Sequence, residues 1–112
     1  MRSATSYLRV TACETAGMAE MTTVGVVGLG TMGAGIVEVF ARAGLRVVAT
    51  EVDEAALERG RAHLVGSTDR AVARGKLAPA SRDALLGRVS FEVGLAGLSE
   101  ADLVVEAVPE KL

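Results

Sequence analysis

Six residues, Gly-Leu-Gly-Thr-Met-Gly at positions 28–33, constrain this chain more than any other feature of its sequence. They follow a β-branched run at residues 23–28, which predicts a buried parallel strand. They open a segment, residues 31–43, whose apolar side chains recur at helical spacing. A G-x-G-x-x-G motif is weak evidence alone, but a strand before it and a helix after it indicate a dinucleotide site.

Each glycine of the motif has a separate physical role in such a site. Gly28 permits the tight turn from strand to helix, Gly30 lets a pyrophosphate approach the backbone, and Gly33 lets the helix lie close to the sheet. The free N–H groups at the helix start then receive the phosphates. A loop that needs glycine only for a tight turn is the alternative explanation.

An acidic residue follows the second strand expected, residues 46–50. Glu51 stands 23 residues after Gly28, close to the spacing of the carboxylate that binds the ribose hydroxyls. A carboxylate there repels a 2′-phosphate, and Val52 stands where an arginine accommodates that phosphate in NADP sites, so NAD is favoured over NADP. FAD sites share the fingerprint, so the motif alone leaves FAD open.

The remaining pattern alternates helices with short apolar strands, which predicts a parallel sheet with right-handed crossovers. Asp53 is a good N-cap for a helix, and Pro79 suits a first helical position. We expect helices at 54–73 and 80–86, strands at 89–91 and 103–107, and a brief turn or helix at 99–101. The fold class is therefore α/β: an incomplete, Rossmann-type doubly wound sheet of about four strands, with a helical hairpin after the second strand.

A chain of 112 residues is expected to form one domain, which we place at residues 22–112. Residues 1–21 lack apolar periodicity and are expected to be a disordered or misassigned extension, with an Arg- and Ser-rich presequence as the alternative. Ending the sheet at the strand 103–107 leaves an apolar edge that invites association.

Bulk composition excludes several partners and sites. The net charge of −2 offers no attraction to nucleic acid, and no segment has the roughly 20 apolar residues of a membrane span. One cysteine, Cys13, and one histidine, His63, cannot build a zinc site, so no metal is expected. A single thiol fits the cytoplasm best.

Three segments resemble the 3-hydroxyacyl-CoA dehydrogenase family, including the bacterial 3-hydroxybutyryl-CoA dehydrogenases. They are Val-Gly-Val-Val-Gly-Leu-Gly-Thr-Met-Gly-Ala-Gly-Ile at 24–36, Arg-Gly-Lys-Leu at 74–77, and Ala-Asp-Leu-Val-Val-Glu-Ala-Val-Pro-Glu at 101–110. The 3-hydroxyisobutyrate and 6-phosphogluconate dehydrogenases open with a similar glycine turn. Those enzymes lack the long hairpin expected at 54–86.

The resemblance implies that the chain is the NAD-binding part of such an enzyme. Met32 is similar to a family residue that contacts the dinucleotide, and Glu51 matches an acid that is usually Asp. Val108 and Glu110 match a segment after the fourth strand, near the ribose and nicotinamide. The predicted cofactor-binding residues are Gly28, Leu29, Gly30, Thr31, Met32, Gly33, Glu51, Val108 and Glu110.

The family reaction is the reversible oxidation of 3-hydroxyacyl-CoA to 3-oxoacyl-CoA, in fatty acid metabolism. Its catalytic histidine and the glutamate that orients it lie beyond the segment matched here, so we predict no catalytic residue in this chain, His63 included. A truncated chain would be inactive alone and would meet acyl-CoA only with the missing C-terminal part; full-length relatives are expected to be homodimers. A stand-alone nucleotide-binding module without catalysis is the alternative.

Overall fold

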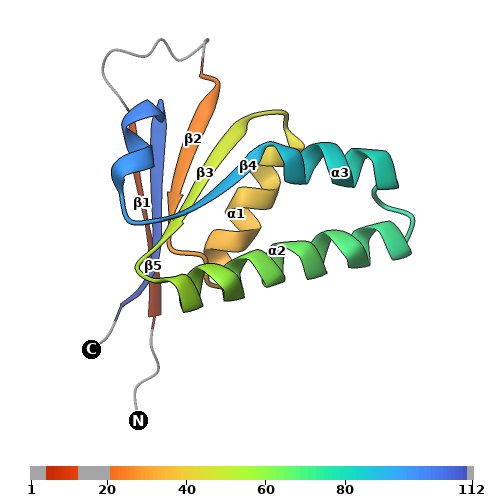
Figure 1. Ribbon diagram of the computed structural model, residues 1–112, viewed down its shortest axis with the longest axis horizontal. Helices are drawn as coiled ribbons and strands as arrows, with labels where there is room; N and C mark the ends of the chain where they lie inside the picture. Colours follow the sequence, from red (N-terminus) through yellow and green to blue (C-terminus); the bar gives the residue numbers. More distant parts are fainter. Residues whose placement is uncertain (1–4, 13–20, 111–112) are drawn as a thin grey trace.

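The computed structural model describes residues 5–12 and 21–110. Its centre is a five-stranded sheet in the order β1-β5-β2-β3-β4 (Figure 1). The strands are β1 (Thr5–Ala12), β2 (Thr23–Val27), β3 (Arg46–Glu51), β4 (Val89–Val93) and β5 (Leu103–Glu110). Within the group β2 to β5, each strand runs parallel to its neighbours. The spatial order of these four strands is that of the first four strands of a Rossmann sheet. The predicted α/β, Rossmann-type fold is confirmed.

Three helices cover one face of this sheet: α1 (Thr31–Arg42), α2 (Glu54–Ala73) and α3 (Pro79–Gly87). Figure 1 shows all three on the same side, with α2 and α3 forming the predicted hairpin. A short 3-10 helix, η2 (Ala96–Glu100), lies on the other face, where Leu98 packs over Gly25. A doubly wound sheet carries α-helices on both of its faces. In the described part of this chain, the α-helices all lie on the same face of the sheet.

The core lies between the sheet and the helices. Alternate side chains of β2 and β3 point to this side, because successive strand residues face opposite ways. Val24 and Val26 of β2 are wholly buried there, and Val37 of α1 and Leu64 of α2 are almost so. The core thus holds both the glycine turn between β2 and α1 and the end of β3 in fixed positions.

Local signals set the helix boundaries close to where the sequence predicts them. Asp53 caps α2 by accepting a hydrogen bond from the Ala56 N–H at 2.8 Å. Pro79 is the first residue of α3, where its missing N–H costs nothing. No helix in the described part of the chain is long and apolar enough to cross a membrane.

Strand β1 is the main departure from expectation. Residues 1–21 are expected from the sequence to be a disordered or misassigned extension, but Thr5–Ala12 pairs antiparallel with β5, from Thr5 opposite Glu110 to Ala12 opposite Leu103. The edge of β5 therefore has a partner. Unpaired backbone N–H and C=O groups at the edge of a sheet pair with an extended segment that reaches them. The local periodicity of a sequence does not reveal this pairing. The rest of that extension lies outside the described residues, except Met21.

Candidate functional site

The glycine turn joins the carboxyl end of β2 to the start of α1. Gly28 has a φ of +93°, a conformation that favours glycine, and its N–H donates to the Thr50 carbonyl at 3.0 Å. A Cβ added to Gly33 would lie 1.7 Å from the Gly28 carbonyl oxygen. Both glycines are therefore required for the turn to fold tightly against α1.

Gly30 differs from its two neighbours in the motif. A Cβ added there would meet no atom within 4 Å among the described residues. Gly30 is the N-cap of α1, and that helix start has no side-chain cap and no acid in its first turn. The N–H groups of the first turn lack intrahelical partners, so this end of α1 suits an anion approaching over Gly30.

Glu51, the last residue of β3, is brought to the same turn. One carboxylate oxygen, Oε2, accepts from the Leu29 N–H at 2.7 Å, and the other, Oε1, accepts from the Val52 N–H at 3.1 Å. The side chain is half-buried. Glu51 thus bridges the end of β3 and the glycine turn, next to the open space at Gly30.

A cavity of about 290 Å³, here called the α2-side cavity, opens on one side of Glu51. It is lined by Leu29, Gly30, Thr31, Glu51, Ala56, Arg59 and His63. Neither Arg59 nor His63 is among the cofactor-binding residues predicted from the sequence. The two side chains are four residues apart, a spacing that places them on one face of α2 and could have indicated a basic pair. His63 is exposed.

A second cavity, of about 410 Å³ and here called the β4-side cavity, opens on the other side of Glu51. It is lined by Val27, Gly28, Thr50, Glu51, Val52, Gly94 and Leu95. Both cavities lie at the carboxyl ends of parallel strands, where open α/β sheets bind their ligands.

Three other predicted residues lie elsewhere. Met32 lines an apolar cavity of about 480 Å³ between α1 and β5, which it shares with Thr31. Val108 and Glu110 are expected after the fourth strand, but this is wrong, because β5 continues through Glu110 while it pairs with β1. The side chains of Val108 and Glu110 are outside the described part of the structure.

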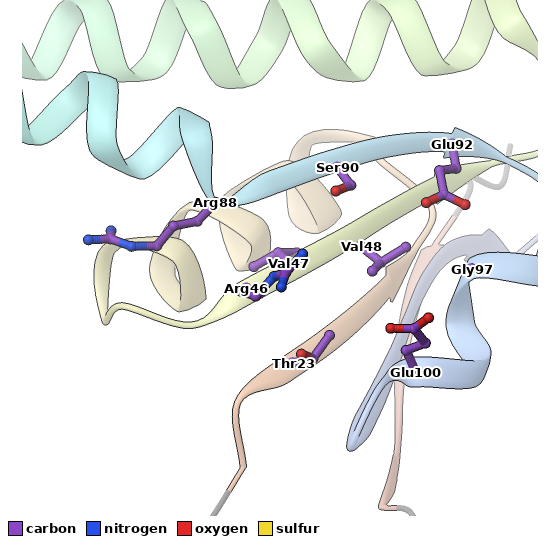
Figure 2. A pocket seen from close by; sticks show the side chains of 9 residues that line it. All are labelled: Thr23, Arg46, Val47, Val48, Arg88, Ser90, Glu92, Gly97 and Glu100. Atoms are coloured by element: carbon purple, nitrogen blue, oxygen red, sulfur yellow. The ribbon is translucent and has the colours of Figure 1, made fainter.

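A cavity of about 170 Å³ lies on the face of the sheet that carries η2 (Figure 2). The carboxylates of Glu92 and Glu100 point into it, and that of Glu92 lies against Gly97. Arg46 adds the opposite charge. No predicted cofactor residue whose side chain is described lines this cavity, so it is separate from the glycine turn. Within residues 5–12 and 21–110, no cluster of three metal-ligating side chains occurs.

Comparison with known proteins places these features in one family. A family model for "3-hydroxyacyl-CoA dehydrogenase, NAD binding domain" matches residues 23–112. The 3-hydroxybutyryl-CoA dehydrogenase of Mycobacterium tuberculosis is 49% identical over 87 residues, which make up 78% of this chain and 30% of that relative. The 5-formyl-3-hydroxy-2-methylpyridine 4-carboxylate 5-dehydrogenase of Mesorhizobium japonicum is 43% identical over 91 residues, which make up 80% of this chain and 28% of that relative.

Solved structures agree. The crystal structure of (S)-3-hydroxybutyryl-CoA dehydrogenase from Ralstonia eutropha matches with a TM-score of 0.71 at 36% identity. The match covers 74% of this chain and 29% of that one. The chain therefore spans less than a third of the length of these relatives.

Proposed function

The chain belongs to the family of 3-hydroxyacyl-CoA dehydrogenase NAD-binding domains, whose cofactor is NAD, and we propose that it provides the NAD site for the interconversion of 3-hydroxyacyl-CoA and 3-oxoacyl-CoA. Membership of this family excludes two alternatives that the sequence left open: an FAD site, and a relationship to the 3-hydroxyisobutyrate or 6-phosphogluconate dehydrogenases. The observation that carries the proposal is the open space over Gly30, at an uncapped helix start beside Glu51.

In this proposal the turn from Gly28 to Gly33, with Leu29 and Thr31, holds the pyrophosphate of NAD. Met32 contributes its backbone N–H at the start of α1, while its side chain lines the cavity between α1 and β5. Glu51 binds the adenosine ribose. A carboxylate has about four acceptor positions, and the Leu29 and Val52 N–H groups take two, so ribose hydroxyls can donate to the others. The same negative charge repels a 2′-phosphate, which favours NAD over NADP.

NAD, when bound, would supply hydride transfer through its nicotinamide, and the resemblance assigns Val108 and Glu110 to that end of the site. Among the described residues we assign no group to proton transfer, because His63 is an exposed residue of α2 and the resemblance puts the catalytic histidine beyond the segment matched here. The acyl-CoA contacts and the proton acceptor are proposed to belong to the part of the relatives that this chain does not match.

The substrate class rests on the relatives. One is named for a 3-hydroxybutyryl-CoA and another for a pyridine carboxylate, although both align with the same glycine turn. The residues described here therefore serve the cofactor that such enzymes share. We place the activity in fatty acid metabolism, in the cytoplasm and in a homodimer.

The test measures NADH binding by fluorescence titration in two variants, one at the N-cap of α1 and one within that helix. Gly30→Val fills the space above the helix start, so we expect the fold to persist and NADH affinity to fall by more than roughly 10-fold. Gly35→Val is the matched control, because a Cβ there also meets no atom within 4 Å, and Gly35 lies in the second turn of α1, past the glycine motif. NADH affinity in Gly30→Val equal to that of the parent would refute the proposal.

A further inference from the structure

Two basic side chains of α2 border the glycine turn and have no partner there. Arg59 and His63 both line the α2-side cavity, and both are exposed. Neither side chain makes a hydrogen bond or an ion pair with any described residue. Arg61 of the same helix differs: its Nε lies 3.6 Å from Oε2 of Glu58, and its guanidinium lies 4.5 Å from the centre of the Phe91 ring. The guanidinium of Arg59 is therefore available to a ligand, whereas that of Arg61 is already engaged.

The carboxylate in the same cavity does not pair with Arg59. The two oxygens of Glu51 accept from backbone N–H groups, Oε2 from Leu29 and Oε1 from Val52. The start of α1 borders the cavity as well, and its free N–H groups have no side-chain cap. The cavity thus offers more donors and positive charge than its single acid uses, which favours an anionic ligand.

The position of Glu51 indicates which anion this is. Glu51 is proposed to bind the adenosine ribose, and of the two cavities that it lines only the α2-side cavity contains basic side chains. NADP differs from NAD by a phosphate on the 2′ position of that ribose, and an arginine nearby accommodates it in NADP sites. A planar guanidinium suits this role because it can bond two phosphate oxygens at once. Val52 follows β3 in place of such an arginine, but Arg59 supplies one from α2.

We propose that Arg59 is a specificity-determining residue, which holds the 2′-phosphate of NADP in the α2-side cavity with His63 as a further donor. The proposal rests on the proposed function, because it assumes that Glu51 holds the ribose. Glu51 repels the 2′-phosphate and Arg59 attracts it, so NADP is a second, weaker cofactor. The two residues together set how strongly the site prefers NAD.

The experiment measures NADH and NADPH binding to the full chain by fluorescence titration and takes the ratio of the two affinities, NADPH over NADH. The parent should bind NADPH, but more weakly than NADH. Arg59→Gln removes the charge at similar length, so we expect it to lower the ratio by about 10-fold. His63→Gln should lower the ratio less, because a neutral imidazole donates a single N–H. Glu51→Gln should raise the ratio, because the repulsion is removed.

Arg61→Gln is the matched control, because it removes the same charge two residues along α2, from a side chain that Glu58 and Phe91 already engage. Its ratio should stay within about 2-fold of the parent, since salt screens charges that do not touch the ligand. Both arginines are exposed, so the two variants should keep the Tm of the parent.

Three outcomes would count against the proposal. If Arg59→Gln has the ratio of the parent, the 2′-phosphate contact is overturned, even where both affinities fall, because an equal loss places the guanidinium at the pyrophosphate. If the parent binds NADH but not NADPH, the contact is overturned while the proposed function stands. If the parent binds neither, the proposed function and the contact are overturned together.

Discussion

Gly30 and Gly33 belong to one motif, but the structure gives them different reasons to be glycine. At Gly33 an added Cβ would overlap the Gly28 carbonyl, so the requirement comes from the folded chain itself. At Gly30 the space is open, so no described residue requires glycine there, and under the proposed function the requirement comes from the ligand. Substitutions at the two positions should therefore separate stability from binding.

We expect Gly33→Ala to lower the free energy of unfolding by about 1–3 kcal/mol, because the turn or α1 must move to admit the methyl group. Gly35→Ala, two residues along the same helix, should raise it by about 0.5–1 kcal/mol, because its Cβ meets open space and alanine favours helix. Urea unfolding measures both. Equal stabilities for the two variants would contradict the close packing at Gly33.

At the scale of elements, one carboxylate ties the start of β2 to the start of β5. Oδ2 of Asp102 accepts from the Thr22 N–H at 2.9 Å and the Thr23 N–H at 3.1 Å. The backbone N–H of Asp102 donates to the Thr23 carbonyl at 2.8 Å. These backbone hydrogen bonds, first that from Thr22 and then that from Thr23, hold the pKa of Asp102 below its ordinary value.

Because the pKa of Asp102 is lower in the folded chain than in the unfolded chain, its stabilising effect is present at neutral pH. It is lost as the pH falls through the folded-state pKa. Asp102→Asn should therefore be less stable than the parent at pH 7, and the gap should close in acid. Urea unfolding over a series of pH values measures this gap.

Asp83→Asn is the control, because Asp83 is exposed and bonds only a neighbouring arginine, Arg82, in the described structure. Exposed pairs of this kind contribute little. A stability gap for Asp102→Asn that stays constant with pH would refute the role of its charge.

At the scale of the whole molecule, β1 occupies the position beside β5. A Rossmann sheet continues there with another parallel strand, whereas this chain supplies an antiparallel strand from its own N-terminal segment. The backbone groups along that side of β5 are therefore paired within the chain. Such pairing blocks the contact through which open edges associate.

A chain beginning at Met21 lacks β1 and should self-associate more than the full chain at the same concentration, because the edge of β5 is then open. Light scattering coupled to size-exclusion chromatography measures the difference. If both chains have the same mass in solution, β1 does not protect this edge.

The sequence alone determined those features that depend on neighbours along the chain. Periodicity and caps placed α2 at Glu54–Ala73, as the structure has it, and the glycine turn with Glu51 indicated the dinucleotide fold. These signals are local, because a helix period, an N-cap or a glycine turn acts within a few residues. The spacing from Gly28 to Glu51 is nearly as local, since a single strand–helix–strand unit fixes it.

Only the tertiary structure decided which distant segments meet. It paired β1 with β5, joined Thr22 to Asp102, and brought Arg59 and His63 beside Glu51. The physical reason is that an edge strand accepts any extended partner within reach, and a cavity forms from whatever side chains packing leaves around it. Neither the partner of an edge strand nor the lining of a cavity can be predicted from the residue pattern of a single segment.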